Sequence, residues 1–510
     1  MLDEYQKKAV EHGTGPCLVI AGPGSGKTKC IVERIAHLIK CGVDGRGILV
    51  ITFTREAAGE MEMRYLRDFT GSGVRFCTFH SLFYHILADR FGRDAIAPKT
   101  KSETESFYDS LGTRTKRLFS DEPGVLLKWK RRFTHILVDE FQDINEEQLE
   151  IVKMLLTDEH NLFAVGDDDQ AIYSFRGSSP RLMLSFKEIF PDADTVTLLN
   201  NYRCKRQIAA AAKSLISQNR IRYKKEIESY SHAYGSLSYK LLPDDMTESV
   251  FVTGEIKRLI SAERESTIGV LFRTKASGML ISESLSMEHI PFFAREKLPS
   301  VRRHFIFRDL VAMLMLAYDE KCSGRDEYAL RATQAFGERC GDHLDVIKKL
   351  SPYAAVNYLC RGGGYELYLR RLSKGSSIYE SELFTRLGEV KSLFAGIKSR
   401  SDFLETFTEE EREEKDHPDS RVGLYTFHGS KGLEFDHVFI IDANEGVTPS
   451  LYAEEKDEGT DETEAKIEEE RRMFYVAVTR AKSSLTVITI SKRSGKRVYP
   501  SRFVREMQLK

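Results

Sequence analysis

The stretch "CLVIAGPGSGKT" at residues 17–28 decides the fold of this chain. An apolar run at 17–22 leads into a loop of small residues, and an amphipathic stretch follows at 27–40. Small residues let backbone N–H groups approach a phosphate, and the start of a helix adds a favourable dipole. Strand, loop and helix in this order are typical of a phosphate-binding P-loop. The predicted loop consists of Ala21, Gly22, Pro23, Gly24, Ser25, Gly26, Lys27 and Thr28.

Two acids at the end of another apolar run complete a predicted nucleotide site. Lys27 is expected to meet the β- and γ-phosphates of ATP, and Thr28 is expected to hold Mg²⁺. The run "ILVDEFQD" at 136–143 places Asp139 where a second Mg²⁺ ligand belongs. Glu140 is placed to orient or deprotonate the attacking water. The two motifs together predict an ATPase, and ATP and Mg²⁺ are the expected cofactors.

Apolar runs and amphipathic stretches alternate over the first 200 residues. This alternation favours a parallel sheet with helical crossovers, which places the chain in the α/β class. A second block of the same kind starts near Ser236. The predicted strands lie at 17–22, 47–54, 74–80, 135–143, 161–167 and 193–199 in the first block, and at 267–274, 422–428, 437–443 and 484–490 in the second.

Two polar, helical stretches interrupt this rhythm and are interpreted as insertions. The sequence therefore predicts two parallel-sheet P-loop domains, each interrupted by a mainly helical insertion. The predicted boundaries are 1–82 and 134–203 for the first sheet domain, 83–133 for its insertion, 204–318 and 420–510 for the second sheet domain, and 319–419 for its insertion.

Composition narrows the class of protein. A chain of 510 residues is too long for one hydrophobic core. The sequence has no run of about eighteen apolar residues and begins with Met-Leu-Asp-Glu, so we expect a cytoplasmic protein without a membrane span. None of the eight cysteines forms a C-x-x-C pair, which predicts structural thiols and not a metal site.

The net charge of −1 excludes a protein that coats nucleic acid with a basic surface. Any nucleic-acid contact must therefore be local. The loop "AVGDDDQAIYSFRG" at 164–177 combines groups that suit a phosphate, Gln170 and Arg176, with rings that suit a base, Tyr173 and Phe175. The residues alone do not explain why one short loop would carry both kinds of group.

Several further motifs, in order along the chain, make the sequence resemble the UvrD/Rep/PcrA-like family of superfamily I DNA helicases. They extend from Tyr5 to about Phe503 and include "DEYQKKAV" (3–10), "TFTREAA" (52–58), "TFHSL" (78–82), "NNYRC" (200–204), "TFHGSKGLEFDHVFI" (426–440), "EEERRMFYVAVTRAK" (468–482) and "PSRFVREM" (500–507). The resemblance implies two RecA-like domains and ATP-driven 3′-to-5′ movement on single-stranded DNA with unwinding of duplex DNA. Single-stranded or tailed duplex DNA is then the expected partner.

The resemblance also implies roles for individual residues. In the nucleotide site, Gln6 reads adenine, Tyr202 stacks on it, Glu434 meets the ribose, Gln170 senses the γ-phosphate, and Arg203 and Arg480 contact the γ-phosphate. Arg480 is expected to reach it across the cleft between two lobes, and Arg176 to help tie the 164–177 loop to the ATP site. The residues expected to contact DNA are Phe53, His80, Tyr173, Phe175, Arg176 and His428.

The sequence departs from the family at two motif positions and in length. Phe175 stands where tryptophan is usual, and "HGSKG" stands where "HSAKG" is usual. The insertions at 83–133 and 319–419 are shorter than those of the family. Because the family's insertions contact duplex DNA, the short versions favour translocation over unwinding without a partner.

Two other functions compete with a helicase. Compact proteins of this kind resemble the helicase-like subunit of the Gabija anti-phage system, which would make the chain a DNA-stimulated or DNA-end-sensing ATPase acting with a nuclease partner. The other is a binding module with an inactive ATP site, against which Lys27, Glu140, Gln170, Arg203 and Arg480 argue. We find no nuclease motif in the chain itself.

Overall fold

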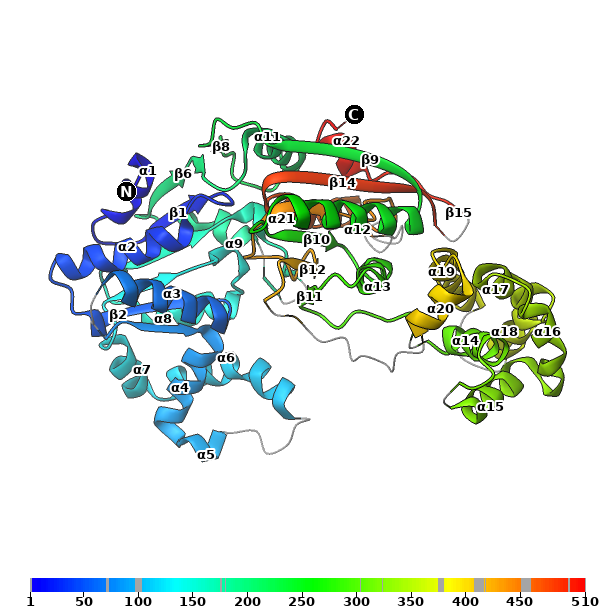
Figure 1. Ribbon diagram of the computed structural model, residues 1–510. Helices are drawn as coiled ribbons and strands as arrows, with labels where there is room; N and C mark the ends of the chain where they lie inside the picture. The colour runs from blue at the N-terminus through cyan, green and yellow to red at the C-terminus, as the bar shows by residue number, and fades with distance from the viewer. Residues whose placement is uncertain are drawn as a thin grey trace. The chain divides into compact units, whose positions relative to one another are not determined.

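The chain folds into two compact units. The computed structural model describes residues 2–69, 73–96, 103–174, 177–178, 180–302, 304–322, 324–374, 380–407, 417, 419–450, 460–493 and 496–509. The first unit consists of Met1–Ser236, Glu455–Ser483 and Glu506–Gln508, and the second of Leu237–Glu454, Ser484–Arg505 and Leu509–Lys510. Each unit is built around its own sheet (Figure 1).

The first unit contains a six-stranded parallel sheet. All six apolar runs that were predicted in the first block form its strands. In spatial order these are β3 (Arg75–Thr78), β2 (Ile48–Thr52), β4 (His135–Val138), β5 (Leu162–Gly166), β1 (Cys17–Ala21) and β6 (Asp194–Leu198). The predicted α/β class with a parallel sheet is therefore confirmed.

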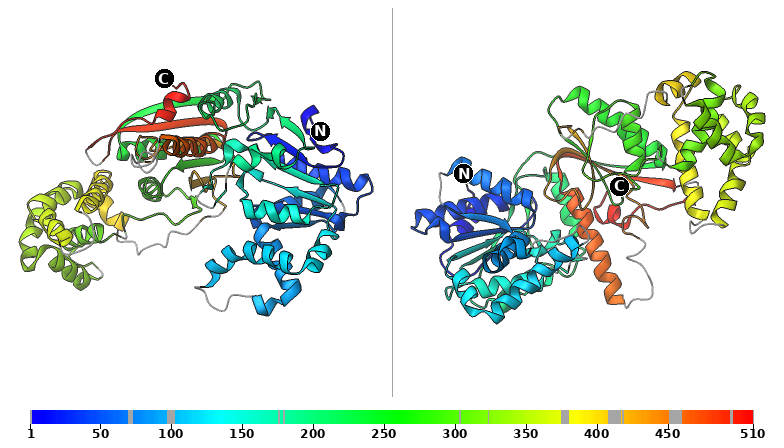
Figure 2. Two further views of the ribbon diagram at one scale, coloured as in Figure 1. Left: turned by 180° about the vertical axis from the view of Figure 1, so that it is seen from behind. Right: turned by 90° about the horizontal axis from the view of Figure 1, so that it is seen from below.

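Helices cover both faces of this sheet (Figures 1 and 2). In β1, Leu18 and Ile20 pack on one face while Cys17 and Val19 pack on the other, so the strand reads as a continuous apolar run. One face is covered by α1 (Glu4–Val10), α2 (Lys27–Lys40) and α3 (Arg55–Asp68). The other face is covered by α4 (Phe79–Phe91), α6 (Glu103–Asp121), α7 (Pro123–Lys130), α8 (Glu146–Leu155), α9 (Pro180–Leu184) and α10 (Phe186–Ile189).

The helices of the first predicted insertion share the core of the sheet. Thr78 ends β3 and caps α4, since its side-chain oxygen accepts a hydrogen bond from the Ser81 amide at 3.2 Å. The short α5 (Arg93–Ile96) follows. Trp129 in α7 is buried in the same apolar cluster as the strands.

A second group of elements joins the first unit through contacts with the sheet's loops. It comprises the short parallel pair β7 (Asn200–Asn201) and β8 (Glu228–Ser229), α11 (Arg206–Ile216) and the long α21 (Thr460–Val478). The sequence assigns residues 204–236 and α21 to the second sheet domain, whereas their contacts group them with the first unit. An apolar pattern marks an element but does not identify the element against which it packs.

The second unit contains a mixed sheet of seven strands. Its order is β11 (Phe293–Ala294), β12 (Val422–Thr426), β10 (Ile268–Phe272), β13 (Phe435–Ile440), β14 (Ala481–Arg493) and β15 (Lys496–Arg497), and β9 (Ser236–Asp244) also pairs with β14. Strands β11, β12, β10 and β13 run parallel, and β15 pairs antiparallel with β14. Flanking or terminal helices are α12 (Asp245–Ala262), α13 (Met279–Met287) and α22 (Arg502–Glu506).

The remaining helices of the second unit form a separate apolar core. They are α14 (Phe305–Tyr318), α15 (Arg325–Phe336), α16 (Leu344–Ile347), α17 (Pro352–Arg361), α18 (Tyr365–Lys374), α19 (Glu380–Ala395) and α20 (Arg400–Phe407). Inside this core the Tyr365 hydroxyl donates a hydrogen bond to Asp309 at 2.7 Å. This apolar cluster also contains Met279 and Leu280 of α13 and Val301, so it includes residues before 319, where the sequence pattern placed the start of the insertion.

Candidate nucleotide and nucleic-acid site

The P-loop connects β1 to α2 as the sequence predicts. Gly26 caps the helix with φ 86°, in the left-handed region that favours glycine, and Lys27 is the first helical residue. The Ser25 hydroxyl donates to the Gly22 carbonyl oxygen at 2.8 Å. The Lys27 ammonium reaches the same carbonyl at 3.5 Å. The loop and its lysine therefore form one folded unit at the helix start, where a phosphate would bind.

Glycine at position 24 allows the residues around Arg203 to approach the P-loop. Gly24 has φ 66°, and a Cβ atom there would lie 2.5 Å from the Arg203 Cβ atom and 2.8 Å from the Asn201 side-chain oxygen. The Tyr202 amide donates to the Gly24 carbonyl oxygen at 2.9 Å. The predicted motif at 200–204 thus lies directly against the phosphate loop.

Gln6 and Tyr202 meet through Asp3. Asp3 and Gln6 form a capping box at the start of α1, and the Gln6 side-chain amide donates to the Ser25 carbonyl oxygen at 2.9 Å. The Tyr202 hydroxyl donates to Asp3 at 2.5 Å, while the residue as a whole remains 42% exposed. An exposed ring beside a fixed side-chain amide is suited to stack on and hydrogen-bond with a purine base.

Asp139 and Glu140 follow β4, which ends at Val138. Glu140 has φ 50°, a left-handed conformation that is uncommon for a residue with a side chain and is found at functional sites. Burial raises the pKa of the Asp139 carboxyl to about 7, and the neighbouring charge of Glu140 adds to this rise. Two acids held together in this way create a local excess of negative charge.

Gln142 joins the ends of β4 and β5. Its side-chain nitrogen donates to the Glu140 carboxylate at 2.5 Å, and its side-chain oxygen accepts from the Asp167 amide at 2.8 Å. Gln142 is fully buried. The orientation of Glu140 is therefore linked to the loop that carries Gln170.

Gln170 and Arg480 are in contact although 310 positions separate them in the sequence. A guanidinium nitrogen of Arg480 donates to the Gln170 side-chain oxygen at 3.2 Å. The Gln170 side-chain nitrogen donates to Asp167 at 2.6 Å. Arg203 donates to the Thr479 carbonyl oxygen at 3.4 Å, next to Arg480. Burial lowers the pKa of Arg480 to about 9, and the charge of Arg203 contributes to the decrease.

Asp167, Asp168 and Asp169 surround the ammonium group of Lys225. The Lys225 nitrogen lies 2.6 Å from Asp167, 2.6 Å from Asp168 and 2.9 Å from Asp169. Three carboxylates this close could bind a metal ion, but here the lysine ammonium lies within contact of all three. Arg222 forms two bonds of 2.7 Å with Asp169. Burial lowers the pKa of Lys225, but the three carboxylates outweigh burial and hold it above its ordinary value.

Two of the predicted DNA-contacting rings lie together. Phe53, after β2, and Tyr173, at the end of the Gln170 loop, stack with centroids 5.0 Å apart and planes inclined by 16°. His80 is exposed near the start of α4 and lies edge-on to Tyr108 at 6.1 Å. Phe175 and Arg176 lie outside the described residues. Glu434 and His428 belong to the second unit, between β12 and β13, and their part in the site stays a prediction.

Comparison with models of known protein families shows to which family the chain belongs. The model of the UvrD/REP helicase N-terminal domain matches residues 2–106 and 95–191. The model of the UvrD-like helicase C-terminal domain matches residues 196–377 and 381–492, which is more than half of the chain. The chain belongs to the UvrD/Rep helicase family. The family suggested by the sequence motifs is thus confirmed.

Individual relatives of the UvrD/Rep family match over nearly the whole chain. YjcD of Bacillus subtilis (strain 168) is 30% identical over 99% of this chain and 80% of its own length. The ATP-dependent DNA helicase Rep of Escherichia coli (strain K12) is 27% identical over 99% of this chain and 94% of its own. The ATP-dependent DNA helicase PcrA of Staphylococcus epidermidis (strain ATCC 12228 / FDA PCI 1200) is 28% identical over 99% of this chain and 86% of its own length. These alignments extend over 618, 649 and 638 positions, so the relatives carry segments without a counterpart here.

Several residues that contact the nucleotide motifs of this UvrD/Rep member were not predicted from the sequence. They include Asp3, Gln142 and Lys225. Gln142 lies inside the quoted "DEFQD" and could have been noticed for its position between two acids. Lys225 lies in a polar run, "RYKKE", that resembles a solvated surface. Its one sequence signal is indirect, since three successive aspartates after a buried strand need a counter-charge.

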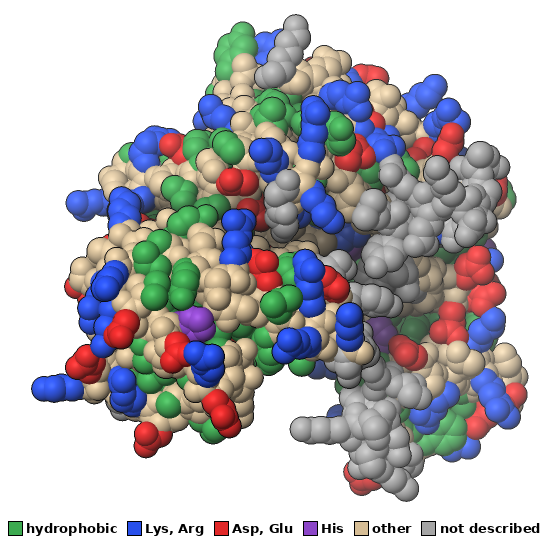
Figure 3. Space-filling view, turned by 90° about the vertical axis from the view of Figure 1, so that its right-hand side faces the viewer, with side chains coloured by type: hydrophobic (Ala, Val, Ile, Leu, Met, Phe, Trp, Pro, Cys, Tyr) green, Lys and Arg blue, Asp and Glu red, His purple; other side chains and the backbone are tan. Residues whose placement is uncertain are grey.

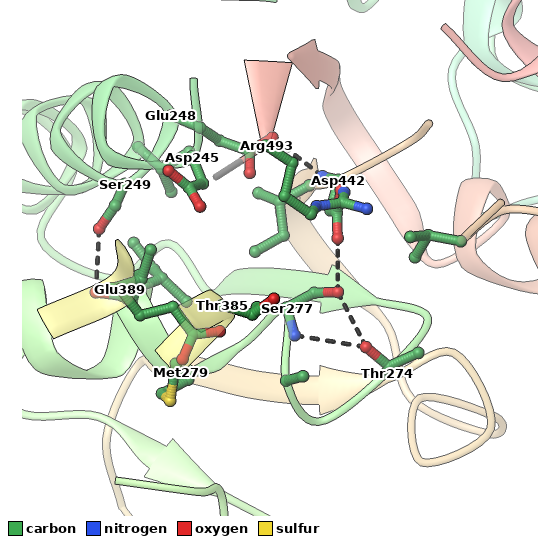
Figure 4. A pocket seen from close by; sticks show the side chains of 16 residues that line it. Asp245, Glu248, Ser249, Thr274, Ser277, Met279, Thr385, Glu389, Asp442 and Arg493 are labelled. Atoms are coloured by element: carbon green, nitrogen blue, oxygen red, sulfur yellow. Dashed lines mark hydrogen bonds and ion pairs between the residues drawn. The ribbon is translucent and has the colours of Figure 1, made fainter. Parts of the chain in front are cut away.

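A cavity of about 200 Å³ lies within the second unit. Figure 4 shows Asp245, Glu248, Glu389, Asp442 and Arg493 around it. None of the residues that line it was predicted for the nucleotide site. Among the described residues, no helix is both long and apolar enough to span a membrane.

Proposed function

We propose that this ATP-dependent DNA helicase hydrolyses Mg²⁺-ATP at the P-loop of its first unit, moves 3′ to 5′ along single-stranded DNA and separates duplex DNA. The observation that carries the proposal is the loop at 167–173. Gln170, at its midpoint, contacts Arg480, and Tyr173, at its end, stacks on Phe53. These contacts support a segment that carries both the proposed γ-phosphate sensor and the proposed platform for bases. We expect a shift of Gln170 to be transmitted to Tyr173.

In the proposed hydrolysis, Lys27 binds the β- and γ-phosphates, and Glu140 orients the attacking water and accepts its proton. Arg480 and Arg203 stabilise the negative charge of the transferred phosphate, a contribution worth roughly 10³–10⁵ in rate for such arginines. Gln6 and Tyr202 hold the base, and Glu434 meets the ribose. Burial of Arg480 supports this role, because a desolvated charge acts more strongly.

The acids after β4 fit a magnesium ion. The pKa of Asp139 is raised because the carboxyl is buried beside Glu140, and a divalent cation would relieve that excess negative charge. Hard cations prefer oxygen ligands, which Asp139 and Thr28 offer. When bound, Mg²⁺ neutralises phosphate charge during transfer.

The proposed DNA contact relies on stacking and not on a basic surface. Base–aromatic stacking contributes about 1–3 kcal/mol per base and tolerates any sequence. Figure 3 shows acidic and basic side chains interspersed over one face of the molecule, in keeping with the net charge of −1. Phe53 and Tyr173 supply the described rings, and His80, Phe175, Arg176 and His428 are proposed to extend the contact.

The test compares ATP hydrolysis by the purified chain without nucleic acid, with single-stranded DNA and with RNA, at one salt concentration. We expect single-stranded DNA to increase the rate several-fold. Strand displacement is then measured on duplexes with a 3′ tail or a 5′ tail, and only the 3′-tailed duplex is expected to unwind. Hydrolysis that does not respond to DNA would contradict the coupling, and unwinding of the 5′-tailed duplex would contradict the polarity.

A second function is favoured by the length of the chain. Its relatives carry segments that it lacks. The chain is therefore also a candidate ATPase that responds to DNA or DNA ends and acts with a nuclease partner in anti-phage defence. DNA-stimulated hydrolysis without strand displacement of either tailed duplex, together with co-purification of a nuclease, would favour this function over the helicase.

A further inference from the structure

The segment at residues 219–230 touches the nucleotide motifs of the first unit in succession. Asn219 donates to the Glu468 carbonyl oxygen in α21 at 3.0 Å, and Arg222 pairs with Asp169. Further along, the Ile227 side chain lies so close to Gly22 of the P-loop that a Cβ atom there would be 2.3 Å away. The segment then pairs through β8 with β7, and the Tyr230 ring lies 4.7 Å from that of Tyr202.

Lys225 is the buried centre of this segment. Its side chain is 1% exposed, and its ammonium group contacts three carboxylates. Burying a lysine costs free energy unless its charge is paired and hydrogen-bonded. A buried lysine held this tightly has a fixed position and therefore fixes the groups it contacts.

A continuous line of hydrogen bonds leads from Lys225 to Arg480. Lys225 donates to one oxygen of Asp167 at 2.6 Å, and the other oxygen accepts from the Gln170 side-chain nitrogen at 2.6 Å. The Gln170 side-chain oxygen then accepts from Arg480 at 3.2 Å. Because an amide has a donor end and an acceptor end, fixing the nitrogen on Asp167 turns the oxygen toward Arg480.

We propose that Lys225 is a positioning residue for ATP hydrolysis, which sets the orientation of the Gln170 amide through Asp167 and thereby the place of Arg480. The proposal rests on the proposed ATPase function and extends it to a residue outside the sequence motifs. We expect Lys225 to affect kcat more than ATP binding if the proposed Gln170 and Arg480 contacts strengthen during transfer of the γ-phosphate, because only such contacts raise kcat.

The first test is Lys225→Met, which removes the charge of the side chain and keeps its approximate length. We expect kcat of basal ATP hydrolysis to fall about tenfold or more while KM for ATP stays within about threefold. Binding of a fluorescent ATP analogue is expected to be retained. The matched control is Arg222→Met, which removes a cation from the same cluster but, among the described residues, pairs with Asp169 and not with Asp167. It is expected to lower the melting temperature while kcat stays near the wild-type value.

A second measurement separates positioning from charge balance. Lys225→Met combined with Asp168→Asn restores the net charge of the cluster, since Asp168 contacts Lys225 but does not bond to Gln170 in the described network. We expect this double variant to regain thermal stability but not kcat. It also provides a folded protein if Lys225→Met alone unfolds.

A double-mutant cycle with Gln170→Ala is the decisive readout. If Lys225 acts through Gln170, adding Lys225→Met to Gln170→Ala causes no further loss of kcat. Additive losses, equal losses in Lys225→Met and Arg222→Met, or recovery of kcat in the charge-balanced variant would each overturn the proposal. Wild-type hydrolysis without a response to DNA would remove the DNA coupling alone, whereas a wild-type chain without hydrolysis would overturn both proposals.

Discussion

Glu140 combines a left-handed backbone with a carboxylate that accepts a short hydrogen bond from Gln142. A backbone in this region costs free energy, about 1–3 kcal/mol, and persists only where the surroundings require it. Here the Glu140 amide also donates to Asp139 at 3.0 Å. The backbone conformation and these hydrogen bonds therefore hold the Glu140 carboxylate in one orientation.

We predict that Glu140→Gln binds ATP but loses about 10²–10⁴-fold in kcat, the usual contribution of a general base. Glutamine keeps the size of the side chain but cannot accept the proton of water. Rapid-quench hydrolysis and binding of an ATP analogue check the two halves of the prediction. The control is Glu62→Gln, an exposed glutamate of α3. Brisk turnover by Glu140→Gln would remove Glu140 as the base.

The stacked pair Phe53 and Tyr173 gives a second prediction at this scale. Phe53→Ala should weaken single-stranded DNA affinity by about 1–3 kcal/mol without changing binding of an ATP analogue. Because the two rings touch, the double variant with Tyr173→Ala should lose less than the sum of the single losses. Fluorescence anisotropy with labelled oligonucleotides measures this, with the exposed Tyr353→Ala as control. Unchanged affinity would make Phe53 a packing residue.

At the scale of elements, replacing glycine by alanine is expected to have opposite effects in the P-loop and in α3. Gly24→Ala should abolish binding of ATP analogues, because the new Cβ atom would meet Arg203 and Asn201 and the residue has φ 66°. Gly59 lies within α3 with open space around it. Gly59→Ala should therefore stabilise the protein by about 0.5–1 kcal/mol. Calorimetry measures the stability of the two variants, and a titration measures their binding of an ATP analogue. Equal binding by Gly24→Ala and Gly59→Ala would contradict the packing of the P-loop against Arg203 and Asn201.

Helix α12 carries the second prediction at this scale. Burial raises the pKa of Glu248 well above its ordinary value, although Glu248 accepts a hydrogen bond from the Asp442 amide at 2.9 Å (Figure 4). The folded state thus prefers the protonated acid, so the stability from Glu248 is present below about pH 4.5 and is lost as the pH rises toward the folded pKa. Glu248→Gln imitates the protonated acid and should raise the melting temperature at pH 8.

The same variant should show little difference from wild type near pH 4.5, where both carry a neutral side chain. Glu255→Gln on the same helix is the control, because its exposed pair with Arg258 contributes little. Melting curves from pH 4.5 to pH 8 check the prediction. A constant difference across this range would mean that Glu248 is ionised in the folded protein.

At the scale of the whole molecule, the eight cysteines report on folding. Six are buried, Cys340 is partly buried and Cys41 is exposed. Burial raises the pKa values of Cys17 and Cys30 to about 12, which suppresses the reactive thiolate. We predict that a thiol reagent modifies Cys41 first and the buried cysteines only as the chain unfolds. Mass spectrometry of alkylated peptides tests the order, and early modification of Cys17 would contradict the packing of β1.

A feature could be predicted from the sequence where the residues that form it lie close together along the chain. The P-loop and the six strands of the first sheet follow from local apolar runs, and α2 begins at Lys27 as predicted. The assignment of Gln170 and Arg480 to one site needed the family resemblance, because nothing local joins positions so far apart, and their direct contact was not predicted. Lys225 escaped prediction, since a polar run does not reveal that one of its lysines is buried.

Gln142 has a consequence for where a proton can go. It is the bridge between Glu140 and the loop at Asp167, and it makes both contacts through a neutral amide. An amide passes on position and orientation, but it does not accept and release protons as a histidine or a carboxylate does. A proton taken up by Glu140 therefore has no relay to Asp167 through Gln142. Departure of the proton with the product phosphate would couple the return of Glu140 to its basic form to product release.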